Sequence, residues 1–209
     1  MAQSTRLGKI AFALPRTPAA EPFERFSALF EQAKGAQPKD PNACTLATVD
    51  DRGRPSARVV LLKGTDSRGF VIYTNQQSRK GKELIGSHFA ALCFYWPALD
   101  VQVRVEGAVE EVTPQESDEY FATRPRNSQL GAWASLQSQP LDSRATLEKR
   151  FSDAAEKYKA GPVPRPPHWG GFRLVPDRFE FWKAGENRLH HREHYQRDPS
   201  GWNKTLLYP

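Results

Sequence analysis

The chain has 209 residues, of which 38% are hydrophobic and 26% are charged, a balance typical of a globular protein with one sizeable core. No apolar run approaches the length of a membrane-spanning helix, and the brief apolar patch near the N-terminus is interrupted by Pro15, so we expect a cytoplasmic protein. The net charge of +6 leaves nucleic acid, membrane surfaces and small anionic ligands open as partners.

Two cysteines, Cys44 and Cys93, lie inside the apolar stretches NACTLATV and AALCFYW. Neither belongs to a CxxC pair, so we predict buried free thiols rather than a disulfide framework. For the organisation of the chain, we expect a flexible N-terminal segment over residues 1–20 and a single domain over 21–209.

The first regular element is predicted over residues 21–36, EPFERFSALFEQAKGA. Phe23, Phe26 and Phe30 recur at helical spacing and Gly35 marks the end, which indicates an amphipathic helix packed on a core. From residue 43 the period changes to that of strands. Five β-branched and aromatic runs, separated by turn sequences such as DDRGRP and GTDSRG, predict strands over 43–50, 57–64, 69–75, 89–96 and 99–112. Strands at hairpin spacing favour an antiparallel barrel or sandwich.

Helices interrupt and follow these strands, with Thr113 and Ser143 as N-caps of two of them. The predicted helical segments are 78–87, 113–125, 127–138 and 143–161. The proline-rich stretch GPVPRPPHWGG at 161–171 predicts a loop. Strand patterns resume over 172–185, 190–198 and 201–209, which indicates an α+β protein dominated by a barrel.

Three of the five histidines fall in FEFWKAGENRLHHREHY, residues 179–195. In a helix, His190 and His194 would suit zinc, but the turn signal at Gly185 favours a strand. A strand places Arg188, His190 and Arg192 on one face. Two arginines repel a cation and attract an anion, so zinc is the less favoured hypothesis and we predict no metal site.

The basic residues are dispersed along the chain rather than forming a stripe. Arg79 and Lys80 open a predicted helix, where free backbone N–H groups and the helix dipole favour a phosphate, and Tyr73, Thr74 and Ser78 precede them. A nucleic acid would require a continuous basic stripe with interleaved aromatic residues. The pattern therefore favours two compact phosphorylated ligands.

Three further side chains suit a planar ligand. Gln102 alternates with valines in VQVRVEG, and a covered amide there requires donors and acceptors together, as an isoalloxazine or pteridine edge provides. Trp133 and Trp182 are aromatic candidates for the core or for the wall of such a site.

In order and spacing, five motifs together resemble the pyridoxine 5'-phosphate oxidase family, also called the pyridoxamine 5'-phosphate oxidase family, over nearly all of residues 20–209. They are ATVDDRGRPSARVVLLKG, GFVIYTNQQSRKGKEL, VQVRVEG, YFATRPRNSQLGAWASLQS and FEFWKAGENRLHHR. The resemblance implies an antiparallel split β-barrel of the Greek-key type with peripheral helices. It also implies a homodimer that binds FMN at the subunit interface, with strands for dimerisation and for the substrate site at the C-terminus.

The resemblance also implies roles for individual residues. The implied FMN-binding positions are Arg58, Val59, Val60, Leu61, Leu62, Lys63, Tyr73, Thr74, Ser78, Arg79, Lys80, Gln102, Gln137, Ser138, Trp182 and Arg192. The implied grip on the substrate phosphate consists of Lys63, Tyr120, Arg124 and Ser128. Arg188 and His190 match the groups over the pyridine ring, as substrate-binding and catalytic residues.

The implied reaction moves a hydride from the C4' carbon of pyridoxine or pyridoxamine 5'-phosphate to FMN, and O2 is reduced to H2O2. The chain departs from the family pattern at Lys183, His191 and Val101, and 1–18 show no clear counterpart of the Arg and Tyr that cover the substrate in many members. Related oxidases of phenazine biosynthesis lack that cover, so a dihydrophenazine carboxylate is the alternative substrate. A flavin or heme binding module without turnover is a second alternative, and a nucleic-acid binder is the weakest.

Overall fold

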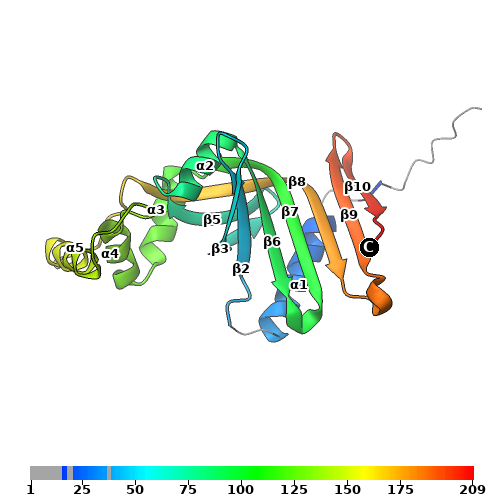
Figure 1. The fold of residues 1–209 in the computed structure, drawn as a ribbon, viewed down its shortest axis with the longest axis horizontal. Helices are drawn as coiled ribbons and strands as arrows, with labels where there is room; N and C mark the ends of the chain where they lie inside the picture. Colours follow the sequence, from blue (N-terminus) through cyan, green and yellow to red (C-terminus); the bar gives the residue numbers. More distant parts are fainter. Residues whose placement is uncertain (1–15, 18–20, 37–38) are drawn as a thin grey trace, which may run out of the picture.

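The computed structural model describes residues 16–17, 21–36 and 39–209. Apart from Arg16 and Thr17, the segment 1–20 that we expect to be flexible lies outside the described residues. Within them, a ten-stranded sheet with antiparallel pairings forms the scaffold (Figure 1). Its strands are β1 (Arg16–Thr17), β2 (Ala43–Val49), β3 (Pro55–Leu61), β4 (Gly64–Asp66), β5 (Gly69–Asn75), β6 (Phe89–Trp96), β7 (Val101–Glu111), β8 (Trp169–Lys183), β9 (His191–Asp198) and β10 (Gly201–Leu206).

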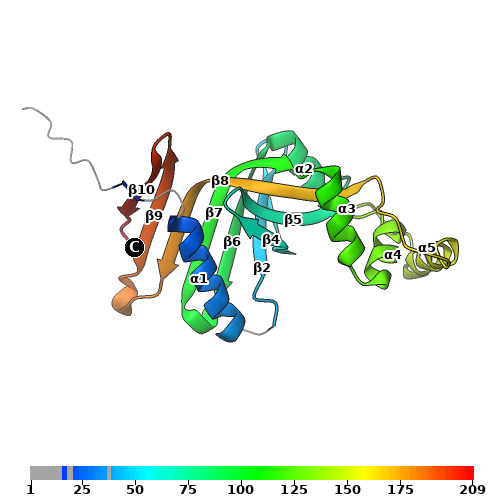
Figure 2. The same cartoon turned by 180° about the vertical axis from the view of Figure 1, so that it is seen from behind.

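The helices are distributed unevenly around this sheet. They are α1 (Glu21–Ala36), α2 (Arg79–Ser87), α3 (Pro114–Thr123), α4 (Arg126–Ala134) and α5 (Arg144–Lys157), with short 3-10 turns η1 (Pro97–Leu99) and η2 (Glu186–Arg188). Helices α3, α4 and α5 gather at one end of the molecule, whereas β9, β10 and the C-terminus lie at the other (Figures 1 and 2). Among the described residues, no helix is both long enough and apolar enough to cross a membrane.

The long strand β8 connects the two ends. One edge pairs with β7, while the other pairs with β5 along its first half and with β9 along its second half. The strand order from β1 runs β10, β9, β8, β7, β6, β2, β3. Residues near Trp169 and residues near Trp182 therefore belong to one strand but to opposite ends of the molecule.

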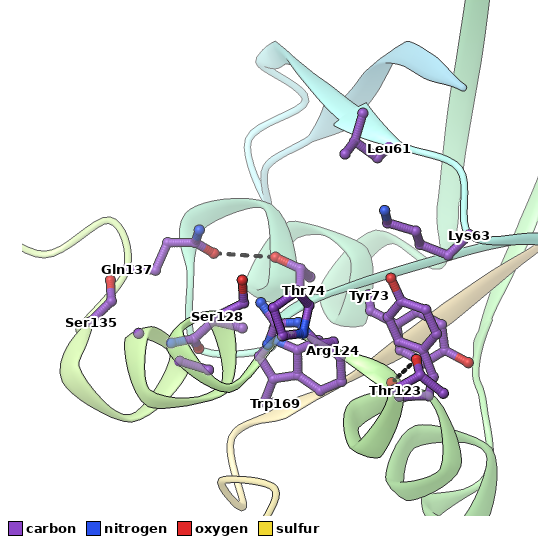
Figure 3. A pocket seen from close by; sticks show the side chains of 15 residues that line it. Leu61, Lys63, Tyr73, Thr74, Thr123, Arg124, Ser128, Ser135, Gln137 and Trp169 are labelled. Carbon is purple, nitrogen blue, oxygen red and sulfur yellow. Dashed lines mark hydrogen bonds between the residues drawn. The ribbon is translucent and has the colours of Figure 1, made fainter. Parts of the chain in front are cut away.

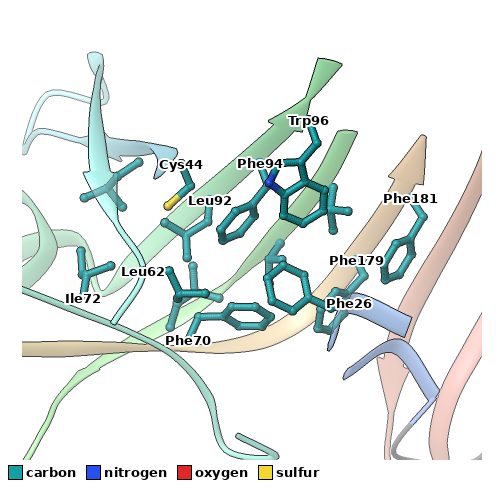
Figure 4. Close-up of a cluster of buried hydrophobic side chains, with 14 of the residues drawn as sticks. Phe26, Cys44, Leu62, Phe70, Ile72, Leu92, Phe94, Trp96, Phe179 and Phe181 are labelled. Atoms are coloured by element: carbon teal, nitrogen blue, oxygen red, sulfur yellow. The ribbon is translucent and has the colours of Figure 1, made fainter. Parts of the chain in front are cut away.

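Helix α1 covers the hydrophobic core between the strands (Figures 2 and 4). Phe26 is fully buried, and its ring makes edge or tilted contacts with the rings of Phe70, Phe94 and Trp96 at centroid distances of 4.8, 5.0 and 6.0 Å. These rings come from α1, β5 and β6, so the aromatic periodicity of the first helix fixes it on the sheet. A second, smaller core of Phe121, Leu130, Ala154, Val163 and Trp169 holds the helical end together.

The predicted elements agree closely with the observed ones. The α+β class and the antiparallel sheet with peripheral helices are confirmed, and Cys44 and Cys93 are free thiols, the first buried and the second half-buried. The three-residue strand β4 has no counterpart in the prediction, because a segment that short carries no period. Helix α5 ends at Lys157, with Tyr158 as its C-cap, rather than at the predicted Gly161.

Helix α3 begins with a complete capping box. The Thr113 hydroxyl accepts a hydrogen bond from the Glu116 backbone N–H, and the Glu116 carboxylate accepts one from the Thr113 N–H. We expect Thr113→Ala to lower the free energy of unfolding by about 1 kcal/mol, measured by urea denaturation. Gln115→Ala, an exposed change in the same helix, is the control and should stay within about 0.5 kcal/mol of the wild type. Equal effects of the two substitutions would contradict the capping role.

Candidate functional site

A cavity of about 580 Å³ opens where α3 and α4 meet β5 and the start of β8 (Figure 3). Both polar and aromatic side chains line it. They are Leu61, Lys63, Tyr73, Thr74, Asn75, Tyr120, Thr123, Arg124, Pro125, Ser128, Gly131, Ala132, Ser135, Gln137 and Trp169. We call this cavity the basic pocket, because Lys63 and Arg124 are its only charged lining residues among the described part of the chain.

All four residues expected to grip a phosphate line the basic pocket: Lys63, Tyr120, Arg124 and Ser128. Lys63 lies between β3 and β4, Tyr120 is on α3, Arg124 caps the end of α3, and Ser128 lies in the first turn of α4. Pro125 separates the two helices and enforces the turn between them. Figure 3 shows the side chains of Lys63, Arg124 and Ser128 directed toward the same space.

Arg124 is half-buried and lacks the partners that a cation with a buried nitrogen normally has. Its Nη1 atom is buried without a hydrogen-bond partner, and no described carboxylate lies within ion-pair distance of it. Its guanidinium carbon lies 4.8 Å from the ring centroid of Trp169 and 5.5 Å from that of Phe121. Burial lowers the pKa of Arg124 below its usual value, and nearby Tyr120 opposes that shift. A buried donor without a partner at the wall of a cavity indicates an anionic ligand.

A second group of polar residues surrounds the N-terminus of α2, at the edge of the basic pocket. Ser78 is the N-cap, and its hydroxyl accepts a hydrogen bond from the Gly81 N–H. The Lys80 ammonium donates to Thr74 Oγ1 at 3.2 Å and to Gln137 Oε1 at 3.0 Å. Burial, followed by the charge of Arg58, lowers the pKa of Lys80. The structure thus brings together four of the predicted FMN-binding residues, which come from three segments of the chain.

Arg58 is held by a buried carboxylate that the sequence prediction missed. Its Nη2 atom donates to Glu83 Oε2 at 3.1 Å, and Arg79 Nε donates to Glu83 Oε1 at 2.8 Å. Glu83 also accepts hydrogen bonds from the hydroxyls of Thr48 and Ser56. Burial alone would raise the pKa of Glu83, but these four donors outweigh it and lower the pKa to about 2.

We expect the contribution of Glu83 to stability to depend on pH. Because its folded pKa of about 2 lies below the ordinary value of 4.5, this contribution is complete above about pH 4.5 and is lost as the pH falls toward 2. Urea unfolding should show Glu83→Gln less stable than the wild type near neutral pH, with the gap closing in acid. Glu119→Gln, an exposed change on α3, should show no such trend. A gap that stays constant across this range would contradict the account.

The run from Arg58 to Leu62 does not act as one surface. Leu61 lines the basic pocket, whereas Leu62 is buried in the main core and Val60 packs against that core. Val59 points outward and is 70% exposed. The alternation of strand β3 is the physical reason, because neighbouring side chains face opposite sides. A ligand beside this run can therefore meet only some of its side chains, together with its backbone.

In the loop after α4, Ser138 has a φ of 71°, a left-handed conformation that is uncommon away from glycine.

The remaining predicted flavin residues lie at the far end of β8. Gln102 on β7 pairs with Trp182 on β8, which pairs with Arg192 on β9, so their side chains share one face of the sheet. Tyr95 on β6 extends this row and is 56% exposed. Arg192 Nε donates to Glu180 Oε1 at 2.8 Å, and Glu180 is itself buried.

The prediction that Arg188, His190 and Arg192 alternate on one strand is wrong. Strand β9 begins at His191, and Arg188 ends the turn η2, where both Asn187 and Arg188 have left-handed backbones with φ of 53° and 63°. Gly185 allows this tight turn, since a Cβ there would lie 2.1 Å from the Leu189 carbonyl oxygen. These two successive residues with left-handed backbones reverse the chain direction before strand β9 begins.

The turn still places His190 against Trp182. Their ring centroids are 4.7 Å apart, and His190 Nδ1 accepts a hydrogen bond from the Gly185 N–H at 3.2 Å. The neutral imidazole therefore carries its proton on Nε2, which is free to donate to a ligand. His194 lies instead beside Glu180 and Thr205, and burial lowers its pKa. In the described part of the chain, no group of three or more potential ligands is arranged to hold a metal ion.

The three departures from the family pattern also meet in space. Val101, Lys183 and His191 are paired across neighbouring strands and line a cavity of about 320 Å³ beside α1. Trp182, the neighbour of Lys183 on β8, lines this cavity as well. None of the three lines the basic pocket.

Comparison with known proteins gives consistent results along most of the chain. A family model described as pyridoxamine 5'-phosphate oxidase matches residues 30–158, and one described as the pyridoxine 5'-phosphate oxidase C-terminal dimerisation region matches residues 169–209. The pyridoxine/pyridoxamine 5'-phosphate oxidase of Myxococcus xanthus is 61% identical over 189 residues, covering 90% of this chain and 92% of its own. The protein of that name from Gluconobacter oxydans is 52% identical over 190 residues, covering 91% and 95%.

Solved structures agree with this result. PhzG from Burkholderia lata 383, solved in complex with tetrahydrophenazine-1-carboxylic acid, is 33% identical with a TM-score of 0.86, covering 92% of this chain and 94% of its own. A pyridoxamine 5'-phosphate oxidase-related, FMN binding protein from Nostoc punctiforme shares the fold, at 16% identity and a TM-score of 0.71, covering 90% and 98%. The predicted split-barrel fold is confirmed. The chain belongs to the pyridoxine/pyridoxamine 5'-phosphate oxidase family.

Proposed function

We propose that this protein is an FMN-dependent oxidase that converts pyridoxine or pyridoxamine 5'-phosphate to pyridoxal 5'-phosphate while reducing O2 to H2O2. The observation that carries the proposal is the buried Nη1 atom of Arg124, which has no partner and lies at the wall of the basic pocket. Lys63, Tyr120 and Ser128 line the same cavity and add an ammonium and two hydroxyl donors. This donor set suits a dianionic phosphate.

The residues around α2 fit the phosphate of FMN. Ser78, Arg79 and Lys80 combine a helix N-terminus with two cations, and no described carboxylate forms an ion pair with Lys80. Thr74 and Gln137 add polar groups at the same edge. Arg58 is already bonded to Glu83, so its role toward FMN is shared with that internal contact. When bound, FMN supplies the hydride acceptor that O2 can reoxidise.

The side chains of this protein bind and orient the substrate. The phosphate grip uses binding energy remote from the reacting carbon to align the substrate, which raises the rate beyond what loose binding allows. Arg188 and His190 cover the pyridine ring, with the Nε2 proton of His190 directed to a ligand oxygen because Nδ1 is occupied by the Gly185 N–H. Trp182 supports the imidazole ring at 4.7 Å and restricts its orientation.

We further propose that two copies of the chain build each site. The basic pocket lies beside α3 and α4, whereas the row of Gln102, Trp182 and Arg192 runs from β7 through the end of β8 to β9. Helices α3 and α4 and strand β9 lie at opposite ends of one copy (Figures 1 and 2). A homodimer with FMN at the interface would bring the pocket of one protomer to the row of its partner. The match of residues 169–209 to a dimerisation region supports this assembly. The cytoplasm remains the expected location, in keeping with the two free thiols.

An oxidase of a dihydrophenazine carboxylate is the second candidate, favoured by the similarity to PhzG. A carboxylate carries one charge fewer than a phosphate and has less use for four convergent donors. The relatives at 52% and 61% identity bear the pyridoxine/pyridoxamine name, which supports the first candidate.

Oxygen uptake by the purified FMN-loaded protein separates these candidates. The proposal predicts uptake with pyridoxine 5'-phosphate, formation of pyridoxal 5'-phosphate and H2O2 in equal amounts, and little turnover of a dihydrophenazine carboxylate. A protein that binds FMN but consumes oxygen only with the phenazine precursor would refute the proposal in favour of the second candidate. A protein that binds FMN and oxidises neither would be a binding module.

A further inference from the structure

Three aromatic rings form a continuous stack in the wall of the basic pocket. Tyr73 and Tyr120 stack with centroids 4.1 Å apart and planes 12° apart, while Tyr73 and Trp169 are 5.4 Å and 6° apart. The stack joins three separate elements, since Tyr73 is on β5, Tyr120 on α3 and Trp169 at the first position of β8. Tyr73 is also anchored by its hydroxyl, which donates to the Glu116 carbonyl at 3.3 Å.

Trp169 takes the place that a carboxylate usually occupies beside an arginine with a buried nitrogen. It is 6% exposed, and the guanidinium carbon of Arg124 lies 4.8 Å from its ring centroid. The negative face of an aromatic ring attracts a cation without accepting strong hydrogen bonds from it. The N–H groups of Arg124 therefore stay available for a ligand.

The neighbouring arginines show the contrast. Arg58 and Arg79 both bond to the carboxylate of Glu83, and Arg173 pairs with Asp66 and Glu116. A carboxylate beside Arg124 would hold the guanidinium equally well, but it would repel an incoming phosphate and compete for the same donors. An aromatic face stabilises the cation and leaves its charge uncompensated.

We propose that Trp169 is a positioning residue that holds Arg124 in place and keeps its charge available for the substrate phosphate. This inference rests on the proposed function, and it adds a residue with no role in the predicted site. Trp169 touches the guanidinium rather than the reacting atoms, so its removal should weaken phosphate binding and leave the chemical step intact.

Steady-state kinetics of two variants test the inference. We expect Trp169→Leu to raise KM for pyridoxine 5'-phosphate about tenfold and to change kcat little, because a desolvated cation–π contact is lost. Trp169→Phe keeps a smaller ring face and should raise KM only about threefold. Tyr158→Leu removes an aromatic side chain from the same helical core without touching the basic pocket, and it should leave KM unchanged.

A binding measurement separates failure of this inference from failure of the proposed function. Titration of the FMN-loaded proteins with inorganic phosphate should show the same order of affinities, wild type above Trp169→Phe above Trp169→Leu, whatever the physiological substrate is. If Trp169→Leu does not fold, Trp169→Phe decides the question. Unchanged phosphate affinity in a folded Trp169 variant, or a fall in kcat at constant KM, would overturn the inference. The wild type could oxidise no phosphorylated vitamer while the three proteins keep the expected order of affinities for inorganic phosphate. In that case only the proposed function fails.

Discussion

Arg124→Ala is expected to lower kcat/KM for pyridoxine 5'-phosphate by about 100-fold, mainly through a higher KM. The reason is that the guanidinium, whose Nη1 atom is buried, forms no ion pair among the described residues, so its loss falls mainly on the ligand. Removing one partner of a buried charge pair typically costs about 2–5 kcal/mol, and about 1.4 kcal/mol corresponds to tenfold. Oxidation of unphosphorylated pyridoxine, which is slow for lack of the phosphate, should change far less.

Arg126 provides the matched control for Arg124. It lies two residues further along the chain, is exposed, and bonds to the backbone carbonyls of Tyr158 and Gly161. Arg126→Ala should therefore leave KM for the phosphorylated substrate within about twofold of the wild type. Equal effects of the two arginine substitutions, or an equal loss of activity with and without the phosphate, would exclude a phosphate-binding role for Arg124.

Arg188→Ala is expected to reduce kcat by about 100-fold or more while the protein keeps its FMN. Arg188 is exposed at the end of η2 and has a left-handed backbone, as does Asn187 before it. A left-handed residue with a Cβ costs about 1–2 kcal/mol, and such strain collects at functional sites. Alanine keeps the Cβ, so this backbone cost is unchanged and the substitution reports on the guanidinium alone.

Single-turnover reduction of the flavin, followed by absorbance, measures the Arg188 effect on chemistry directly. Leu189→Ala is the control, because Leu189 is 68% exposed beside Arg188 and carries no polar group. The control should reduce its flavin at close to the wild-type rate. A nearly silent Arg188→Ala would instead support a flavin-binding module without turnover.

The fold was largely predictable because the hydrophobic periods are strong. The first helix, β5 and β6 were predicted at their observed bounds, since each consists of a clear apolar pattern between turn residues. The pairing of β5 and β9 along the same edge of β8 was not predictable from such patterns. Local sequence determines where a strand occurs, whereas its partner depends on packing between distant segments.

The candidate site was predictable only in part. The resemblance to the oxidase family pointed to Lys63, Tyr120, Arg124 and Ser128, and the structure brings all four to one cavity. No sequence pattern pointed to Glu83 or Trp169, because an acidic residue in a helix and an aromatic residue at a strand start are ordinary features of any sequence. Glu83 and Trp169 matter because of the arginine side chains that they contact. The only available signal for Glu83 was its i, i+4 spacing from Arg79.

The histidine-rich segment shows how one wrong local assumption changes a site. A uniform strand would place Arg188, His190 and Arg192 on one face, but the turn at Asn187 and Arg188 delays the strand to His191. His190 reaches Trp182 through this turn and Arg192 reaches Glu180 through the strand. The residues stay close together although the geometry that unites them differs from the prediction.

The central claim is that one oxidase site combines the basic pocket of one protomer with the Arg188 segment of its partner, and subunit mixing tests it most directly. Arg124→Ala and Arg188→Ala protomers, each nearly inactive alone, are co-expressed so that they form dimers at random. Half of the dimers are then mixed, and each mixed dimer has one site with both substitutions and one with neither. The account predicts that activity returns to about one quarter of the wild-type value per dimer. Mixed preparations that are no more active than the separate variants would show that each site lies within one chain. That result would contradict a site shared between two protomers.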